Sequence, residues 1–394
     1  MSEAQPEIQK KLIIAFDAKR LFNNFTGLGN YSRTFVRNLQ KFYPENEYHL
    51  FTPKIKENEE TAYFLNNQNF IIHTPKSVLP LWRTFGISKD INQLMPDIYH
   101  GLSHEIPYNL DKKIIKIVTF HDLIYEKFPS QFHWADLKIY RFKYLSSARR
   151  ADHIIAISKS TKNDLKEMYN ISKEKISVVY QSCSEAFQQP SSEAKMCPEA
   201  IKGLSPYYLY VGSIIERKGL LQTVIAFSKL PDQLKKPFVV VGKGSASYIN
   251  KISEMIHYYK LHEYFYFING IQNTALASIY ENCFALVYPS IYEGFGIPII
   301  ECLYQARPVI TSDTSSMPEA AGPGAILINP YSAEDIKNAM LRLNDNKLYD
   351  ELKVKGREHV VFSFSSEVTT SKAMQLYIKL SEGKKKPDSV HISG

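Results

Sequence analysis

Two glutamates and a glycine-rich turn in the second half of the sequence have the types and spacing of an anion-binding site. Glu293 and Glu301 flank Gly294-Phe-Gly296, which follows a strand ending near Tyr288 and precedes a helix beginning near Ile297. Glycine amides at a helix N-terminus bind anions, most often phosphate. A carboxylate beside phosphate must face something else, and a pair of hydroxyls can donate hydrogen bonds to it. The spacing suggests a diphosphate at the amides and sugar hydroxyls at each glutamate, although two solvated acids at a helix start explain it as well.

A pair of cations follows the first predicted strand of the same half. Arg217 offers a planar fork and Lys218 a point charge, and both suit phosphate oxygens. Gly212 permits close approach of the backbone to a ligand, and Gly219 opens the next helix. Such a pair is usually only solvated charge. At the same sheet edge as Gly294-Phe-Gly296, it becomes the cationic half of a diphosphate clamp.

The first half holds two candidate segments, each after an apolar strand. Gly27 and Gly29 precede a predicted helix, but Ser32 replaces the third glycine of a dinucleotide fingerprint, so we predict a flexible loop that reaches into a cleft. His121 and Asp122 stand at the carboxyl end of a strongly apolar strand. A His-Asp pair there is a candidate site, with a structural histidine paired to a carboxylate as the alternative.

These residues must be positioned by alternating strands and helices. Continuous apolar runs predict buried parallel strands at 12–16, 48–51, 70–73, 98–100, 114–120, 153–157, 176–179, 208–211, 238–241, 264–268, 284–288, 309–311 and 326–328. Helices are predicted at 31–42, 140–149, 160–169, 219–230, 248–259, 274–282, 297–305, 333–343 and 366–380. The alternation breaks once, in a proline- and serine-rich stretch, and then restarts.

We therefore predict an α/β protein with two doubly wound, Rossmann-like domains whose sheet-edge crevices face each other across a cleft. The first domain covers residues 1–185, a linker 186–206 and the second domain 207–365. A last helix, 366–381, is expected to return to the first domain, ahead of a flexible lysine-rich tail at 382–394.

Composition narrows the class of protein. The 394 residues are 44% hydrophobic and 22% charged, which is ordinary for a globular chain, and the net charge of +8 tolerates phosphorylated, nucleic-acid or membrane partners. We expect no signal peptide and no membrane-spanning helix. The four cysteines lie far apart without a C-x-x-C, as in reduced cytoplasmic proteins. No D-x-D, P-loop or G-x-S-x-G occurs, which argues against a metal held on a diphosphate by paired aspartates.

Taken together, the motifs resemble those of the retaining glycosyltransferases of family 4, which have the GT-B fold. The resemblance spans about 300 residues in a matching order. The similar segments are Thr26-Gly-Leu-Gly-Asn-Tyr31, Phe120-His-Asp-Leu123 with Phe128-Pro129, Arg150-Ala-Asp-His-Ile-Ile-Ala-Ile-Ser158, Gly212…Arg217-Lys-Gly219, Glu293…Glu301 and Ser315-Ser-Met-Pro-Glu319. Ser315-Ser316 departs from the family, many of whose members have glycines there, and so does the helix segment from Cys302 to Arg307.

The resemblance implies a role for each candidate. The catalytic residues would be His121, beside the transferred sugar and the acceptor, with Arg217, Lys218 and Glu293. Glu301 would hold the ribose hydroxyls. The nucleotide-sugar-binding residues would be Gly27, Gly29, Gly212, Arg217, Lys218, Gly270, Ile271, Glu293, Gly294, Phe295, Gly296 and Glu301, with Gly270 and Ile271 at the base. No metal and no further cofactor is implied.

Within the family, the segment from His121 to Pro129 looks most like bacterial mannosyltransferases of polysaccharide assembly, lipopolysaccharide included. That resemblance implies transfer of mannose from GDP-mannose to a glycan or lipid-linked glycan. The alternatives are a UDP-sugar donor carrying glucose, galactose or N-acetylhexosamine, and an inactive sugar-nucleotide-binding module. Nucleic acid is not an expected partner, because +8 is a small charge for this length and no nucleic-acid module is present.

Two basic segments suggest a peripheral membrane partner. Arg33, Arg37 and Lys41 recur at helical spacing, and residues 138–150 are basic with many aromatics. Such faces suit anionic lipid surfaces, and an ordinary solvated basic face is the alternative. We expect the protein in the cytoplasm, at the inner face of the plasma membrane if these segments bind lipid.

Overall fold

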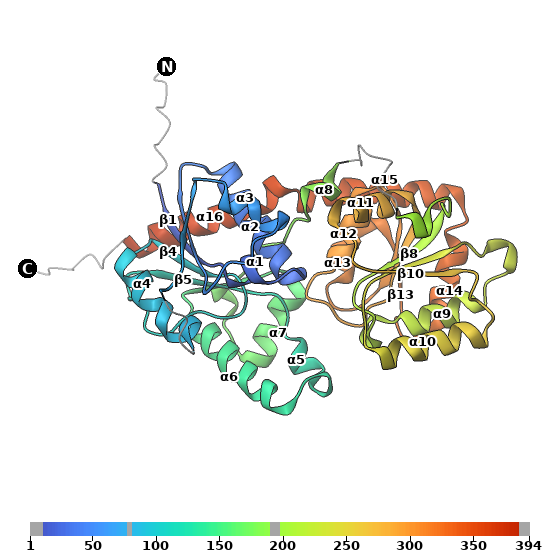
Figure 1. Cartoon of the computed structure of the whole chain (residues 1–394), viewed down its shortest axis with the longest axis horizontal. Helices are drawn as coiled ribbons and strands as arrows, with labels where there is room; N and C mark the ends of the chain where they lie inside the picture. Colours follow the sequence, from blue (N-terminus) through green and yellow to red (C-terminus); the bar gives the residue numbers. More distant parts are fainter. Residues whose placement is uncertain (1–10, 77–80, 190–197, 386–394) are drawn as a thin grey trace, which may run out of the picture. The chain divides into compact units, whose positions relative to one another are not determined.

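The computed structural model describes residues 11–76, 81–189 and 198–385. The chain divides into two compact units. The first comprises the residues up to Ile157, Lys162–Gln181 and those from Thr369 onward; the second comprises Ser158–Thr161 and Ser182–Val368. Each unit is built around one parallel sheet flanked by helices (Figure 1).

The sheet of the first unit has seven strands in the order β3-β2-β1-β4-β5-β6-β7. Its strands are β1 (Ile13–Asp17), β2 (Glu47–Phe51), β3 (Phe70–His73), β4 (Ile98–Gly101), β5 (Ile115–Phe120), β6 (His153–Ala156) and β7 (Ile176–Val178). All neighbouring strands pair in parallel. Most of their side chains are buried, as expected for a sheet covered on both faces.

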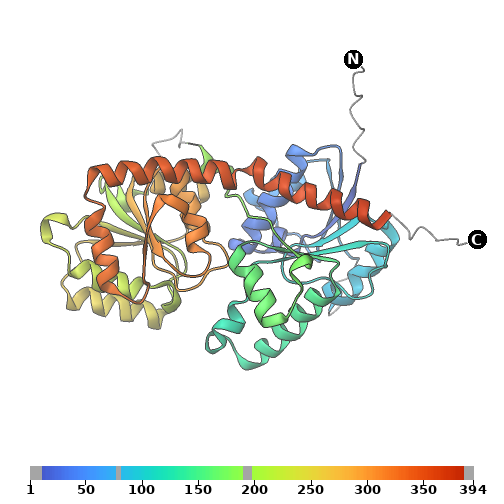
Figure 2. The same cartoon turned by 180° about the vertical axis from the view of Figure 1, so that it is seen from behind.

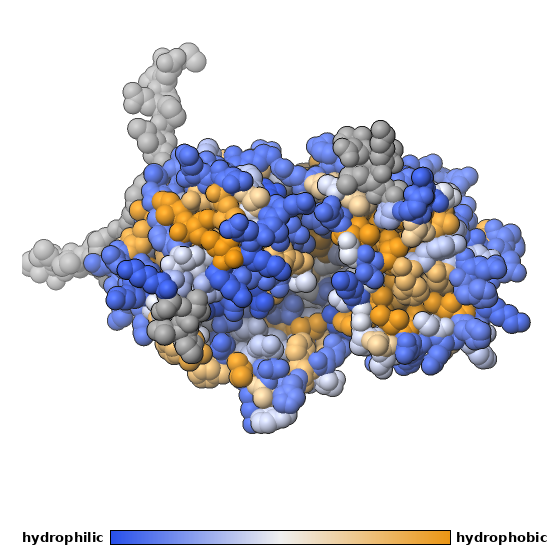
Figure 3. Space-filling model, viewed as in Figure 1, coloured by the Kyte–Doolittle hydropathy of each residue, from blue (hydrophilic) through white to orange (hydrophobic). Residues whose placement is uncertain are grey.

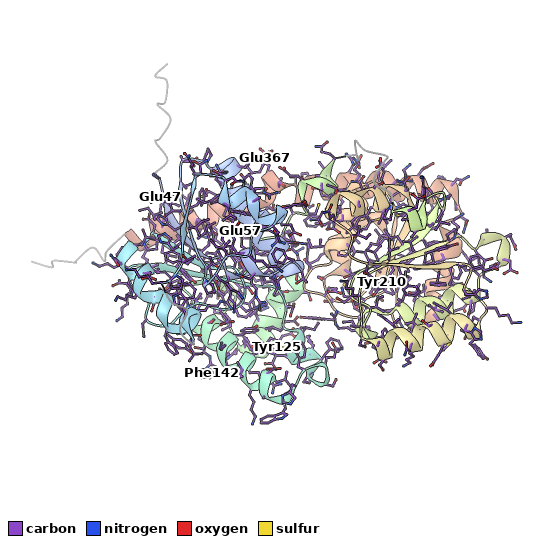
Figure 4. The ribbon with its side chains drawn as sticks, in the orientation of Figure 1. Glu47, Glu57, Tyr125, Phe142, Tyr210 and Glu367 are labelled. Atoms are coloured by element: carbon purple, nitrogen blue, oxygen red, sulfur yellow. The ribbon has the colours of Figure 1, made fainter. Side chains whose placement is uncertain are left out.

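The sheet of the second unit has six strands in the order β10-β9-β8-β11-β12-β13, again all parallel. They are β8 (Tyr207–Val211), β9 (Phe238–Val241), β10 (Phe265–Ile268), β11 (Cys283–Tyr288), β12 (Val309–Ser312) and β13 (Ala325–Ile328). Tyr210, labelled in Figure 4, lies on β8 with its side chain fully buried. The predicted fold class, two doubly wound parallel α/β domains, is confirmed, and every predicted strand is present.

Helices cover both sheets. Those of the first unit are α1 (Lys19–Asn23), α2 (Gly27–Phe42), α3 (Glu59–Leu65), α4 (Ile87–Leu94), α5 (Ile124–Lys127), α6 (Trp134–Arg150) and most of α7 (Lys159–Tyr169). The second unit has α8 (Glu185–Gln188), α9 (Leu220–Ser228), α10 (Ala246–Tyr258), α11 (Asn273–Asn282), α12 (Ile297–Tyr304), α13 (Met317–Ala321), α14 (Ala333–Arg342) and α15 (Asn346–Phe364). Within the described ranges, no helix is both long enough and apolar enough to cross a bilayer.

The last helix, α16 (Ser366–Lys385), belongs to the first unit from Thr369 onward. Figure 2 shows it extending across that unit. Tyr377 Oη lies 2.6 Å from His100 Nδ1 on β4, and Lys384 Nζ donates to the carbonyl oxygen of Ile114 at 2.8 Å. Tyr377 and His100 are fully buried, so this contact fixes the helix against the core of the unit.

Several sequence-based expectations about local structure are wrong. Gly27 and Gly29 form the first turn of α2 instead of a flexible loop, and residues 382–385 continue α16 instead of starting a flexible tail. The sequence reading also missed α15 entirely. The predicted linker carries α8, whose Phe187 packs edge-on against Tyr280 of α11 with ring centres 5.9 Å apart. Cys197 and the end of the predicted tail, 386–394, lie outside the described residues.

One of the two predicted basic faces, that of α2, is partly buried. Arg33 is 5% exposed, pairs with Glu60 and donates to the carbonyl oxygens of Leu21 and Asn24 at 3.0 and 2.8 Å. Arg37 lies over the ring of Tyr63, with its guanidinium carbon 4.5 Å from the ring centre. Arg33 and Arg37 thus have partners inside the unit, whereas Lys41, the third residue of the predicted face, is exposed, so lipid binding by this face stays a prediction.

Candidate functional site

The carboxylate of Glu293 collects the polar groups predicted for the second unit. Its Oε1 lies 3.3 Å from a terminal nitrogen of Arg217 and 3.0 Å from Lys218 Nζ. The hydroxyls of Tyr288 and Ser290 donate to the same oxygen at 2.9 and 2.8 Å. Four donors on one oxygen form the most concentrated charge cluster of the predicted site.

The strand order explains how these residues meet. Arg217 and Lys218 follow β8, whereas Tyr288 ends β11, and these two strands are neighbours in the sheet. The backbone N–H of Ile291 donates to the carbonyl oxygen of Arg217 at 2.9 Å, which ties the two loops together. Gly219 has φ +70°, and a Cβ there would lie 2.4 Å from the carbonyl oxygen of Pro289. A glycine is required at this crossing.

Electrostatics keep Glu293 ionised. Burial alone would raise its pKa, but the charges of Lys218 and Arg217 and the hydrogen bond from Ser290 lower it to about 2. The two cations are themselves only 12% and 7% exposed. Arg217 Nε is buried without a hydrogen-bond partner in the described part of the chain. Two cations against one carboxylate leave a net positive charge, which suits a further anion.

The glycine turn continues from this cluster into a helix. Gly296, at φ +103°, is the N-cap of α12, and Pro298 stands in its first turn. Phe295 is buried, with its ring edge-on to Phe364 at 5.2 Å. The N-terminus of α12 therefore begins directly beside the charged cluster, where its amides and dipole favour an anion.

The loop after β12 holds the turn from the other side. Ser315 and Ser316 donate their hydroxyls to the carbonyl oxygen of Glu293 at 2.8 and 2.9 Å. Ser315 has φ +56°, in the left-handed region that glycine adopts most easily. The departure from glycine noted in the sequence thus keeps the glycine-type backbone and adds a side-chain hydrogen bond.

Glu301 lies one turn into α12 and is 8% exposed. The hydroxyl of Tyr280 donates to its Oε2 at 2.9 Å. Burial raises the pKa of Glu301 to about 7, and the Tyr280 hydrogen bond only partly opposes this. The two glutamates of the motif therefore have opposite electrostatic environments: Glu293 is anchored by cations, whereas Glu301 titrates near neutral pH.

Gly212 and Gly270 are the other predicted positions at this sheet edge, after β8 and β10. A Cβ on Gly212, at φ +141°, would lie 3.1 Å from Lys218 Nζ, so the glycine makes room for the lysine. Gly270 has φ +71° and no atom within 4 Å of its would-be Cβ, and Ile271 beside it is half-buried. Gly270 therefore borders open space beyond the end of β10.

His121 follows β5 in the first unit and is 5% exposed. Its Nε2 donates to the carbonyl oxygen of Leu102 at 2.9 Å, and its backbone N–H donates to His104 Nε2 at 3.1 Å. The ring of Tyr31 stands edge-on to it, with centres 4.6 Å apart. Burial, followed by the charge of His104, lowers the pKa of His121 to about 3, so the ring is neutral at physiological pH.

Gly27 and Gly29 open α2, and the side chain of Asn24 caps this end. Asn24 Oδ1 accepts from the backbone N–H groups of Thr26 and Gly29 at 3.1 and 3.0 Å. A Cβ on Gly29 would lie 1.7 Å from the carbonyl oxygen of Asn24, which explains the glycine. Gly27 has open space around its would-be Cβ.

The structure thus brings Arg217, Lys218 and Glu293 into direct contact inside the second unit, while His121, Gly27 and Gly29 belong to the first. Sequence reasoning missed the partners: Tyr288 and Ser290 on Glu293, Tyr280 on Glu301, and Asn24. Tyr288 and Ser290 could have been predicted, because both have hydroxyls and stand between the end of the predicted strand and Glu293. In the described part of the chain no three His, Cys, Asp or Glu side chains cluster as metal ligands would.

Family models and known proteins match most of this chain. A family model described as "Glycosyltransferase Family 4" matches residues 25–183, and one described as "Glycosyl transferases group 1" matches 191–359. The O-antigen chain mannosyltransferase B of Escherichia coli is 23% identical, over 92% of this chain and 99% of that protein. The O-antigen chain mannosyltransferase RfbU of Salmonella typhimurium is 29% identical, over 57% of this chain and 59% of that protein.

Solved structures share the fold. A glycosyltransferase of Rickettsia africae aligns with a TM-score of 0.71 and 17% identity, covering 94% of this chain and 98% of that one. HepE of Anabaena, solved in complex with UDP and glucose, aligns with a TM-score of 0.71 and 13% identity, covering 94% of this chain and all of that one.

Proposed function

The chain belongs to the family 4 glycosyltransferases, and from this premise we propose that it transfers a mannosyl unit from GDP-mannose to a hydroxyl of a glycan in bacterial surface-polysaccharide synthesis. The names of the two mannosyltransferase relatives support the choice of sugar and pathway class. The single observation that carries the donor site is the cluster of Arg217 and Lys218 beside Glu293, at the N-terminus of α12.

The proposed chemistry is electrostatic. Negative charge builds on the diphosphate as it leaves the sugar, and Arg217, Lys218 and the amides of Gly294 to Gly296 would stabilise it. These groups do the work that a divalent cation does in other transferases, so we propose a metal-independent reaction. Departure and attack on the same face of the sugar would retain its configuration, with a leaving-group oxygen accepting the acceptor proton.

The ion pairs give Glu293 a further task. Without donor, its Oε1 occupies the cations that the diphosphate needs. In our proposal the diphosphate replaces Glu293 in these contacts, and the Glu293 carboxylate then accepts hydrogen bonds from the hydroxyls of the transferred sugar. Glu301 would accept hydrogen bonds from the ribose, and Gly270 with Ile271 would border the base. The neutral ring of His121 would meet the transferred sugar and the acceptor by hydrogen bonding.

A thermal-shift panel of GDP-, UDP-, ADP- and dTDP-sugars tests the donor. A ligand at 100 times its Kd stabilises by about 2.7 kcal/mol, a rise of roughly 5–10 °C for a domain of this size. We expect the largest rise with GDP-mannose, and slow release of mannose from it. A larger rise with UDP-glucose, UDP-galactose or a UDP-N-acetylhexosamine would identify that sugar nucleotide as the donor instead of GDP-mannose. Stabilisation without turnover with any acceptor would indicate an inactive binding module, and no rise with any of them would contradict the proposal.

A lipid-linked acceptor would bring the enzyme to the cytoplasmic face of the plasma membrane, and α6 offers a surface for it. Trp134, Lys138 and Phe142 recur every four residues on one face of this helix; Trp134 and Phe142 are 64% and 69% exposed. In Figure 4 Phe142 lies on the outer side of the first unit, and Figure 3 has hydrophobic and hydrophilic side chains interspersed over this region. Exposed aromatics beside basic side chains suit an anionic interface.

Sedimentation with phosphatidylglycerol vesicles tests this surface. We expect binding that phosphatidylcholine vesicles do not give, and that the double substitution Trp134→Ser and Phe142→Ser removes. Phe362, which is 83% exposed on α15, provides the control Phe362→Ser. Equal binding by the double variant and the wild type would reject α6 as the contact.

A further inference from the structure

The carboxyl edge of the first sheet carries a second group of charges. Strands β1, β4 and β5 are neighbours, so the residues that follow them lie side by side. Lys19 and Arg20 follow β1, His104 and Glu105 follow β4, and His121 follows β5. His121, proposed to meet the transferred sugar, therefore shares this edge with Lys19 and Arg20, two cations outside the family motifs named above.

Arg83 satisfies the carboxylates at this edge. Its Nε lies 2.5 Å from Asp17 Oδ2, and a terminal nitrogen lies 2.6 Å from Glu105 Oε1. Its other terminal nitrogen donates to the carbonyl oxygen of Ser103 at 3.2 Å. Lys143 also approaches Glu105, at 3.6 Å. Asp17 and Glu105 are therefore already paired with other cations.

Lys19 and Arg20 have no such partner. Neither forms an ion pair with any residue in the described ranges, and Arg20 Nε is buried without a hydrogen-bond acceptor. Burial, followed by the charge of Arg83, lowers the pKa of Lys19, and the carboxylates of Asp17 and Glu105 oppose this only in part. A buried guanidinium nitrogen without an acceptor is unfavourable until a ligand supplies one.

Arg20 lies near groups that would surround an acceptor. After burial, the positive charge of Arg20 contributes to the lowered pKa of His104 and, more weakly, to that of His121. Tyr144 stacks on His104 with ring centres 4.7 Å apart. Tyr144 lies on α6, whose outer face carries Trp134 and its neighbours.

We propose that Lys19 and Arg20 form an anion subsite of the acceptor site and bind a phosphoryl group of the acceptor. The proposal rests on the proposed function, which puts His121 of the first unit beside the acceptor. Arg20 offers the planar fork that matches two phosphate oxygens, and Lys19 adds a point charge. A lipid-linked acceptor would supply such a phosphate close to the bilayer that α6 is proposed to meet.

Binding of decyl phosphate to the full chain tests the subsite. The chain is first saturated with the nucleoside diphosphate that the donor panel selects, so that the cations of the second unit are occupied. Inorganic phosphate and methyl glucuronide serve as further probes, because they separate a lipid phosphate from a free anion and from a carboxylated sugar. The variants are Lys19→Gln and Arg20→Gln, with Lys166→Gln, an exposed position on α7, as a control of equal charge.

We expect Arg20→Gln to weaken decyl phosphate about 10- to 100-fold and Lys19→Gln about 10-fold, with Lys166→Gln unchanged. Equal loss of inorganic phosphate would support the subsite and identify the anion itself as the determinant. Unchanged affinity for both phosphates in Arg20→Gln, or a loss confined to glucuronide, would overturn the proposal. Affinity for the nucleoside diphosphate is measured in parallel. If the wild type binds no nucleoside diphosphate, the donor assignment fails, and the phosphate titration still decides whether Lys19 and Arg20 bind an anion.

Discussion

Replacing Glu293 by glutamine tests the charge cluster most quantitatively. The pKa of Glu293 falls from an ordinary 4.5 to about 2 in the folded chain. A depressed carboxylate pKa stabilises the fold above the unfolded value, and the stabilisation is lost as the pH falls through the folded value. The difference corresponds to about 3 kcal/mol at pH 7, or roughly 6–12 °C in the melting temperature of a unit of this size.

Thermal melting at pH 7 and pH 3 measures this contribution. We expect Glu293→Gln to melt roughly 6–12 °C below the wild type at pH 7, and the gap to shrink to less than half at pH 3. Glu254, an exposed carboxylate on α10, provides the control Glu254→Gln, which should melt with the wild type. A Glu293→Gln variant within about 2 °C of the wild type at pH 7 would refute the paired geometry.

Three other substitutions or conditions have defined outcomes. Burial raises the pKa of Glu301 to about 7, so between pH 4.5 and 7 the folded state holds a proton that the unfolded state has lost, and stability falls as the pH rises. Glu301→Gln should therefore raise the melting temperature at pH 8 and change it little at pH 4.5. Gly219→Ala should lower the melting temperature more than Gly270→Ala, since both glycines have positive φ but only at Gly219 would a Cβ lie 2.4 Å from a carbonyl oxygen. Equal melting temperatures of the two variants would contradict the crowding at Gly219. The kcat of Glu301→Gln should not change between pH 5 and 8 through titration of His121, because the pKa of His121 lies near 3. A change of kcat at an ordinary histidine pKa that the additional substitution His121→Asn removes would contradict the buried ring.

The strands could be predicted because each is a short continuous apolar run between polar turns, the pattern of a sheet covered on both faces. Helix α15 could not. Its buried residues Leu352, Gly356, Val360 and Phe364 recur every four positions, with a glycine among them. That glycine exists because a Cβ there would lie 2.6 Å from Leu303 Cδ2, a tertiary contact that the local sequence does not encode.

The site was predictable as a location but not as a set of bonds. Strand-end motifs indicated that Arg217, Lys218 and Glu293 share one sheet edge. They did not indicate that Glu293 would pair with the cations, because that depends on β8 and β11 being neighbours and on the turn geometry at Gly219. The prediction of a flexible loop at Gly27 and Gly29 was wrong for a similar reason. The Asn24 side chain accepts a hydrogen bond from the backbone N–H of Gly29, and both glycines lie in the first turn of α2.

The most direct measurement of the central claim is kcat of Arg217→Ala and Lys218→Ala with the donor that the panel identifies, since removing one preorganised donor to a developing anion typically lowers the rate by about 10²–10³. Lys243, an exposed lysine after β9, provides the control Lys243→Ala. We expect both site variants to fall in that range while they melt as folded proteins and the control keeps the wild-type rate. Rates near the wild type in both site variants would contradict the assignment of the cations to the leaving diphosphate.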